Sequence, residues 1–404
     1  MKKDVLILCQ YFYPEYVSSA TLPTEMAEDL VENGLSVDVL CGYPSEYSTD
    51  KDLPKKQKYK NINIRRVKYI QLNKKRTLSR LINYFSFIFS MLLRWPRMMN
   101  YKCIIVYSNP PLLPIIPAIL SAIFRKKFIF VSYDIYPDLA VLMDTIKKGN
   151  MIYKLMSFTN KLVYKHASKV IALGEEMKTY MLDNKFTTVE EKIMVIPNWY
   201  DGTKIQQVSS NTKMNPIEDN KFRVLYSGNM GTCQDMDTIM KCIYIMKDNR
   251  NVQFILTGHG NKVNEIKQYI DANNLLNVKM YGFLVGDEYL KMLESADCYL
   301  VSLERGVEGM SVPSKTYSYL AAGRPLLSIM SSDTDISKQL NTNNAGYSFN
   351  QGDARGLANK IEFLSNNLEV CDSMGLNARK IFDENYERKI STGKYLDVIR
   401  SLIT

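Results

Sequence analysis

Short apolar runs alternate along this chain with segments whose apolar residues recur at helical spacing. In the first half these runs predict strands at Val5–Cys9, Val37–Cys41, Ile62–Val67, Cys103–Tyr107, Phe128–Val131, Val170–Leu173 and Ile193–Ile196. In the second half they predict strands at Arg223–Tyr226, Val252–Leu256, Val278–Tyr281, Cys298–Val301 and Leu326–Ile329. Strands that alternate with helices are typical of parallel sheets with crossover helices. The chain is therefore predicted to be an α/β protein.

The length of 404 residues predicts two domains, because a single core of ordinary size does not extend that far. The stretch with the fewest apolar residues is 201–220, which is polar and contains a proline, so it is the predicted linker. We expect an N-terminal domain at 1–203 and a C-terminal domain at 204–385. A last helix, at about 386–404, is expected to pack back on the first domain.

Composition excludes several classes of protein. A hydrophobic content of 46% with 23% charged residues is typical of a folded soluble protein rather than a disordered one. The seven cysteines form no CxxC pair, which favours reduced thiols in a cytoplasm over disulfides or a zinc site. Only two histidines occur, His166 and His259, so a His-rich metal site is excluded and no metal is predicted.

The net charge of +10 is concentrated in one block of the chain. Residues 51–102 contain 15 Lys or Arg and one acid, Asp52, whereas the remainder carries 37 basic and 41 acidic residues. A local excess of this kind favours a docking face over general nucleic-acid binding.

Inside this block lies an unusually apolar helical segment, Leu81–Leu93. Its 13 residues would span about 20 Å, too short to cross a hydrocarbon layer of roughly 30 Å. Two interpretations are open: an ordinary core helix, or a helix at a membrane surface. The flanking cations favour the second, because they suit anionic headgroups; they are Lys74, Lys75, Arg76, Arg80, Arg94 and Arg97.

Two glycine-containing segments of the second half carry the chemistry. In FRVLYSGNMG (222–231) a buried strand enters a turn bracketed by Gly228 and Gly231, and SVPSKTYSYLAAGRPLL (311–327) reads as loop, helix and strand. Turns at the carboxyl ends of parallel strands form a crevice lined by backbone N–H groups, where phosphate binds.

With these segments in place, the chain resembles the retaining nucleotide-sugar glycosyltransferases of family 4, most closely those of capsule, O-antigen and colanic-acid synthesis. The resemblance implies the GT-B fold, two facing Rossmann-like domains with parallel sheets and a cleft between them. The matching segments are QYFYPE (10–15), SYDIYPD (132–138), IPNW (196–199), LYSGNMG (225–231), SADCYLVSL (295–303), VPSKTYSYLAAGRP (312–325) and GDARGLA (352–358).

A nucleotide-sugar donor carries a diphosphate whose negative charge grows as the glycosidic bond breaks, so its site needs preorganised donors and cations. Lys315 and Ser314 can supply an ammonium, a hydroxyl and N–H groups. Gly228, Asn229 and Gly231 form the turn that lets the backbone approach the pyrophosphate.

Two further donor-side residues are open to more than one interpretation. Arg324 is a second candidate cation, or a structural salt bridge at a helix end. Relatives often have two glutamates seven residues apart; Ser318 occupies the place of the second, and Glu308 is the remaining candidate for holding sugar hydroxyls, or a solvated loop acid.

On the acceptor side, Asp134 occupies a position where many relatives have a histidine, and it could orient the acceptor hydroxyl or act as a base. The segment from Gln10 to Glu15, with Tyr13, is expected to form the acceptor-side lip. The resemblance implies a metal-independent, same-face transfer without a cofactor, in which the donor phosphate helps to deprotonate the acceptor. It further implies a UDP-linked donor, a polyprenyl-linked glycan acceptor, and a cytoplasmic enzyme held peripherally at the inner face of the membrane.

Two alternatives remain open from the residues. A nucleotide-sugar epimerase of the same fold would be expected to show more cleft histidines and carboxylates. A non-catalytic homologue that only holds donor or lipid is kept open by the absent glutamate pair. Nucleic-acid binding is disfavoured, because the basic block lacks a glycine–aromatic RNA-binding pattern and lies beside an apolar helix.

Overall fold

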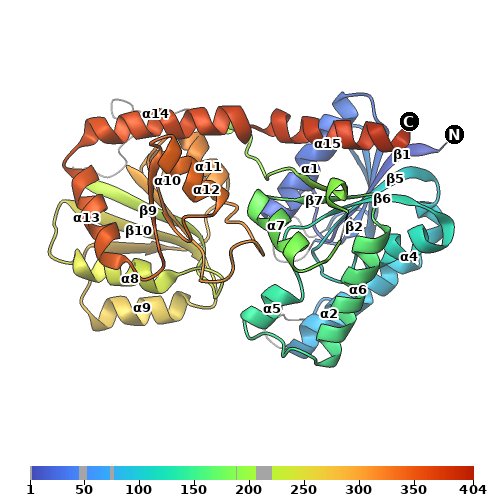
Figure 1. Ribbon diagram of the computed structural model, residues 1–404, viewed down its shortest axis with the longest axis horizontal. Helices are drawn as coiled ribbons and strands as arrows, with labels where there is room; N and C mark the ends of the chain where they lie inside the picture. The colour runs from blue at the N-terminus through green and yellow to red at the C-terminus, as the bar shows by residue number, and fades with distance from the viewer. Residues whose placement is uncertain (1, 45–51, 73–76, 188, 206–220) are drawn as a thin grey trace. The chain divides into compact units, whose positions relative to one another are not determined.

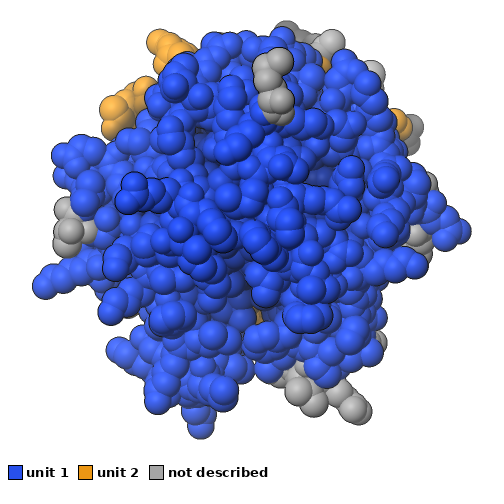
Figure 2. Space-filling model, turned by 90° about the vertical axis from the view of Figure 1, so that its right-hand side faces the viewer, with its two compact units in different colours: residues 1–198, 310–312, 389–404 blue, residues 199–309, 313–388 orange. Residues whose placement is uncertain are grey.

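The structure is a computed structural model that describes residues 2–44, 52–72, 77–187, 189–205 and 221–404. These residues form two compact units, coloured separately in Figure 2. The first unit contains residues 1–198, 310–312 and 389–404, and the second contains 199–309 and 313–388. The predicted domains were 1–203 and 204–385, with a last helix at about 386–404. The units change instead after residues 198 and 388, and the structure adds the short segment 310–312 to the first unit. Most of the predicted linker, 206–220, lies outside the described residues.

The first unit is built on an eight-stranded sheet with the order β3-β4-β2-β1-β5-β6-β7-β8. Its strands are β1 (Lys3–Leu8), β2 (Val37–Gly42), β3 (Lys56–Tyr59), β4 (Ile62–Val67), β5 (Tyr101–Tyr107), β6 (Lys127–Val131), β7 (Lys169–Ala172) and β8 (Ile193–Val195). All pairs are parallel except β3 with β4. Every residue of β2 is buried, as expected for a strand covered on both faces.

Helices cover this sheet and connect its strands. They are α1 (Ser18–Glu32), α2 (Thr77–Leu92), α3 (Trp95–Met98), α4 (Ile115–Phe124), α5 (Asp138–Leu142), α6 (Met151–His166) and α7 (Glu175–Asp183), with α15 (Arg388–Ile403) at the end of the chain. Helix α15 is tied to α1, because Lys389 and Thr392 both bond the carboxylate of Asp29. The last helix thus contributes residues 389–404 to the first unit.

The second unit is a six-stranded parallel sheet with the order β11-β10-β9-β12-β13-β14. Its strands are β9 (Phe222–Asn229), β10 (Val252–His259), β11 (Val278–Tyr281), β12 (Cys298–Ser302), β13 (Leu326–Ile329) and β14 (Gly346–Phe349). Its helices are α8 (Met236–Ile245), α9 (Val263–Ala272), α10 (Gly286–Glu294), α11 (Thr316–Ala322), α12 (Asp335–Thr342), α13 (Ala354–Ser365) and α14 (Leu368–Asn385). In Figure 1, α8 and α9 lie on one side of the strands, and α10 to α12 lie on the other.

Local sequence explains where several of these helices begin. The side chain of Asp235 accepts a hydrogen bond from the Thr238 amide at the start of α8, and Asp353 accepts one from Gly356 at the start of α13. Such caps satisfy amides that have no partner inside the helix.

The predicted strands match the observed ones, and the α/β prediction is confirmed. Strands β3 and β14 were not predicted.

Candidate functional site

The strand order of the second unit changes direction at β9. From β9 the chain proceeds through β10 to β11 on one side, and then returns to place β12 on the other side. The pairing of β9 with β12 ends at Leu225 and Tyr299, whereas its pairing with β10 continues to Asn229 and His259. The carboxyl end of β9 therefore departs from β12. Ligands of open α/β sheets bind at such a switch point.

The hydroxyl of Tyr319, on α11, occupies the place where the β9–β12 pairing ends. It accepts a hydrogen bond from the Ser227 amide at 2.7 Å and donates one to the Ser227 carbonyl at 2.9 Å. Its ring stacks on that of Tyr299, with centroids 4.5 Å apart. A phenol can donate and accept at the same time, so one side chain satisfies both backbone groups. This contact fixes α11 beside the carboxyl end of β9.

Lys315, directly before α11, is a desolvated cation beside this glycine turn. A Cβ atom placed on Gly228 would lie 3.7 Å from the Cγ atom of Lys315, so the two predicted donor-side residues are in contact range. The Lys315 ammonium lies 4.5 Å from the ring centroid of Tyr289, whose hydroxyl bonds Ser318 at 2.7 Å. Burial lowers the pKa of Lys315 to about 8. No acid among the described residues forms a salt bridge with it.

The glycine turn is held by a second glycine segment, Gly258-His259-Gly260, at the end of β10. Gly258 and Gly260 have φ values of 139° and 147°, and a Cβ on either would lie within 2.1 Å of a backbone oxygen of the 228–231 turn. The Met230 amide donates to the His259 carbonyl at 2.6 Å. The two turns thus pack backbone against backbone. The sequence prediction did not include this second turn, although the glycine spacing at 258–260 is a visible signal.

Asn229 and Gly231 differ from Gly228 in their surroundings. The side chain of Asn229 lies over Gly231, since a Cβ on Gly231 would be 2.9 Å from Asn229 Nδ2. The Gly231 amide already donates to Gln234 Oε1 at 3.3 Å. Of the predicted turn residues, Gly228 is therefore the one that the structure places against Lys315.

Glu308 is engaged within its own unit. One carboxylate oxygen accepts from the Gly306 amide at 2.8 Å, and the other accepts from the Ser331 amide at 3.2 Å and from Gln351 Nε2 at 2.6 Å. It therefore ties the 303–309 loop to the ends of β13 and β14. These bonds are more than a solvated loop acid would make, and whether Glu308 also holds a sugar stays a prediction.

Arg324 lies at the opposite end of α11 from Lys315. Its guanidinium is buried and donates to the carboxylate of Asp372 on α14 at 2.9 Å. The seven-residue helix α11 lies between the two cations. The structure therefore does not bring Arg324 close to Lys315. The salt bridge with Asp372 agrees with the alternative interpretation of Arg324, a structural ion pair at the end of the helix. Ser314 is exposed beside Lys315.

In the first unit, Asp134 follows β6 at the carboxyl edge of the sheet. The amides of Tyr133 and Asp134 both donate to Ser108 Oγ, which fixes the turn. The Asp134 carboxylate accepts a hydrogen bond from Ser311 Oγ at 2.6 Å, within segment 310–312 of the same unit. Burial raises the pKa of Asp134, and the hydrogen bond from Ser311 acts in the opposite direction. A carboxyl group with a raised pKa suits acid–base work.

Tyr13 and Glu15 have structural contacts at the end of β1. The ring of Tyr13 stacks on Tyr59 with centroids 3.8 Å apart, and its carbonyl accepts from Arg66 at 2.8 Å. Glu15 is buried, with 6% of its surface exposed. An acceptor-lip role for both stays a prediction. The predicted membrane-side residues Lys74, Lys75 and Arg76, and the side chain of Arg80, lie outside what the structure describes.

Helix α2 is partly buried in the core and partly exposed, and a membrane-surface role for it stays a prediction. Its polar stripe bonds the backbone of the segment after β4: Asn83 pairs with Leu72, Ser86 accepts from the Ile70 amide, and Ser90 donates to the Lys68 carbonyl. Phe87 and Met91 are buried in the core, whereas Phe85 and Phe89 are 47% and 62% exposed. One side of α2 is therefore core, and another presents apolar side chains to the surface.

Among the described residues, no helix is long and apolar enough to cross a membrane. Within the same residues, no three His, Cys, Asp or Glu side chains are grouped closely enough to hold a metal ion.

The two sheets are parallel apart from the β3–β4 pair, and the second has a glycine-lined switch point beside a lysine that no described acid pairs. This arrangement suits a phosphate-bearing ligand. Residues 208–381 match the family model described as glycosyl transferases group 1, so the chain carries a domain of that family and is a glycosyltransferase.

Two curated relatives and one solved structure illustrate the similarity. The chain is 27% identical to the probable glycosyltransferase WbjE of Pseudomonas aeruginosa, over 83% of this chain and 84% of WbjE. It is 23% identical to the putative colanic acid biosynthesis glycosyl transferase WcaI of Escherichia coli K12, over 44% of each chain. Anabaena HepE, solved with UDP-glucose, has a TM-score of 0.75 at 15% identity, over 99% of this chain and 100% of HepE. The GT-B prediction is thereby confirmed.

Proposed function

We propose that this protein is a retaining glycosyltransferase that moves a sugar from a UDP-linked donor to a polyprenyl-diphosphate-linked glycan in bacterial surface polysaccharide synthesis. The observation that carries the donor half is the Lys315 ammonium: it is desolvated, has no acid partner among the described residues, and lies beside Gly228 at the β9 switch point. Holding a cation there without an anion is unfavourable, and a diphosphate would remove the penalty.

In the proposed reaction, the bond from the sugar C1 to the diphosphate oxygen breaks, and its electron pair stays on the diphosphate. The acceptor hydroxyl oxygen forms the new bond to C1 on the same face, and its proton passes to the departing phosphate oxygen. Lys315 stabilises the charge that develops on the leaving group, and preorganised stabilisation of this kind is usually the main source of rate enhancement in such a site. Asp134 would orient the acceptor hydroxyl in the first unit.

Several features support the finer parts of this proposal. HepE was solved with UDP-glucose, which favours a UDP-linked donor. WcaI is named for colanic acid biosynthesis, which favours surface polysaccharide as the product. The basic block at 51–102 and the exposed apolar side of α2 favour an acceptor presented at the inner membrane surface, with the enzyme attached peripherally.

The test compares the unaltered protein with Lys315→Ala in two assays: thermal unfolding with a panel of nucleoside diphosphates, and release of UDP from UDP-sugars with and without lipid-linked acceptor. We expect UDP to raise the unfolding temperature of the unaltered protein, and UDP release to need Lys315. Lys291→Ala removes an exposed lysine of α10 and is the matched control. Stabilisation by no nucleotide at all would overturn the proposal, and stabilisation without turnover would favour the non-catalytic alternative.

A further inference from the structure

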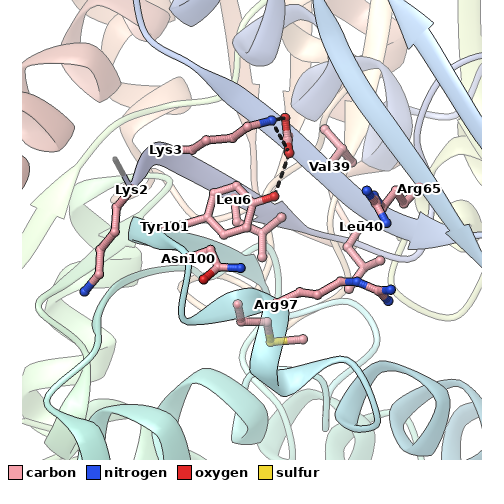
Figure 3. Close-up of a pocket in the computed structure, with 11 residues that line it drawn as sticks. Lys2, Lys3, Leu6, Val39, Leu40, Arg65, Arg97, Asn100 and Tyr101 are labelled. Carbon is pink, nitrogen blue, oxygen red and sulfur yellow. Dashed lines mark hydrogen bonds and ion pairs between the residues drawn. The ribbon is translucent and has the colours of Figure 1, made fainter.

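A cavity of about 670 Å³ lies in the first unit at the amino ends of β1 and β5 (Figure 3). Its lining includes Lys3, Asp38, Arg65, Arg97, Asn100 and Tyr101. Because ligands of α/β sheets bind at the carboxyl ends of the strands, this cavity is separate from the positions of Gln10 and Asp134. Its lining contains none of the predicted donor-side or acceptor-side residues.

The one carboxylate in the lining is already satisfied. Asp38 accepts hydrogen bonds from Lys3 at 2.8 Å, from Asn63 at 2.8 Å and from the hydroxyl of Tyr101 at 2.6 Å. Lys3 is therefore neutralised inside the cavity, and so is Asp38. The charge that remains in the lining comes from Lys2, Arg65 and Arg97.

Two guanidinium groups are directed into the same space. Figure 3 shows Arg65, from β4, and Arg97, from α3, on one side of the cavity, with the Asn100 amide facing them, while Lys2 points away. Both arginines are exposed, and among the described residues no acid forms a salt bridge with either. Burial and the bond to Asp38 raise the pKa of Tyr101, and Arg65 and Arg97 both oppose that rise, which indicates that both lie near its hydroxyl.

Exposed apolar side chains lie on and beside α3, the short helix that carries Arg97. Trp95 belongs to the same helical turn as Arg97, is 40% exposed, and stacks on Phe124 of α4 with ring centroids 5.8 Å apart. Phe124 is 48% exposed, and Leu93, two residues before Trp95, is 60% exposed. A freely dissolved anion would gain nothing from these side chains. A phospholipid presents a phosphate and acyl chains together, which suits paired arginines beside exposed aromatic rings.

We propose that Arg65, Arg97 and Asn100 bind the phosphate of an anionic phospholipid headgroup, while Trp95, Phe124 and Leu93 enter the boundary of the acyl chains. This inference rests on the membrane-surface part of the proposed function, and it fixes the headgroup site at residues other than Lys74, Lys75, Arg76 and Arg80. Planar guanidinium groups can bind a phosphate through two parallel N–H bonds each, which lysine cannot do.

The experiment measures binding of the full chain to vesicles of phosphatidylglycerol and phosphatidylcholine, and to vesicles of phosphatidylcholine alone, by sedimentation and tryptophan emission. The chain has two tryptophans, and Trp199 is 5% exposed, so a blue shift on binding reports Trp95. We expect the double variant Arg65→Ala, Arg97→Ala to bind anionic vesicles on the order of 30-fold more weakly, as expected for two cations lost from a membrane surface. The variant Arg65→Lys, Arg97→Lys, with its charge retained, should lose binding in part.

The control is Lys147→Ala, Lys154→Ala, which removes two exposed charges of the same unit outside the cavity. If the control and the alanine variant lost vesicle binding equally, the proposed headgroup site in the cavity would be wrong, and only a general attraction of the basic protein to the membrane would remain. An unaltered protein that ignores anionic vesicles would overturn both the site and the membrane part of the proposed function. If tryptophan emission shifted to the blue with millimolar inorganic phosphate but not with vesicles, the ligand of the cavity would be a dissolved anion and the phospholipid proposal would be wrong.

Discussion

At the scale of single residues, the buried ammonium of Lys315 lowers the stability of the folded protein, and the same ammonium is proposed to bind the diphosphate of the donor. Its pKa of about 8 lies below the ordinary value of 10.5, because burial disfavours the ammonium form. The unfolded chain therefore holds this proton more tightly than the folded protein does. Lysines in this condition are candidates for functional sites, because a structural lysine is usually solvated or paired.

We expect Lys315→Met to raise stability at pH 7, by about 1 kcal/mol, and to lower turnover on the order of 10²-fold. The unaltered protein should gain stability as pH rises from about 8 toward 10.5, and the methionine variant should lack this gain. The value of kcat/KM should fall above pH about 8 as the ammonium is lost. Urea unfolding and pH–rate profiles measure these effects. A variant that is both more stable and fully active would remove Lys315 from the site.

The pair of Asp134 and Ser311 gives a prediction on the acid side. The hydrogen bond from Ser311 favours the ionised carboxylate, so its removal in Ser311→Ala should raise the pKa of Asp134 further. If the ionised form orients the acceptor, the acid limb of the kcat profile moves to higher pH, and the loss of activity is larger at about pH 6 than at about pH 8. Asp134→Asn should lose activity at every pH. A uniform loss in Ser311→Ala would instead assign that residue a structural role.

At the scale of elements, the donor site depends on one hydroxyl that joins α11 to β9. In Tyr319→Phe the Ser227 amide and carbonyl both lose their partner in a buried place, which costs about 1–3 kcal/mol. Because α11 positions Lys315, we also expect the KM for the nucleotide sugar to rise. Thermal unfolding and UDP titration test both effects.

The matched control for this change is Tyr347→Phe in β14. Tyr347 is half-buried and lies under the ammonium of Lys360, but its hydroxyl bonds no described residue. It should change stability by less than about 0.5 kcal/mol. A Tyr319→Phe variant that loses stability but keeps its affinity for UDP would show that the contact supports the fold alone.

The same elements show how far the sequence can be interpreted. The central strands were predicted because they are continuous apolar runs, whereas β3 (KQKY) is a polar edge strand that no such pattern reveals. Gly228 and Lys315 were predicted as partners from the turn and helix signals. The roles of Tyr319 and Gly258 were not, because each depends on a contact with a residue distant in sequence. The bonds of Arg324 and Glu308 likewise follow from long-range packing that spacing does not encode.

At the scale of the whole molecule, the chain returns to its first unit at its end. Four apolar side chains of α15 are at most 8% exposed: Tyr395, Leu396, Val398 and Ile399. The polar tie is Asp29 of α1, which is 3% exposed and accepts from Lys389 Nζ and Thr392 Oγ1, each at 2.8 Å. The last helix is thus part of the core of the first unit, although 360 residues separate Lys389 from Asp29.

Asp29→Ala should therefore destabilise the first unit by about 2–3 kcal/mol, because a buried hydroxyl and an ammonium lose their common acceptor. Glu32→Ala is the control: Glu32 bonds the same Lys389 ammonium at 2.8 Å, but its side chain is 61% exposed, so its loss should cost less than about 1 kcal/mol. Scanning calorimetry with and without UDP separates the effects, since UDP should raise the unfolding temperature of the second unit equally in both variants. Equal, small losses in the two variants would show that apolar packing alone holds α15. A UDP response abolished by Asp29→Ala would show instead that the donor site needs this tie.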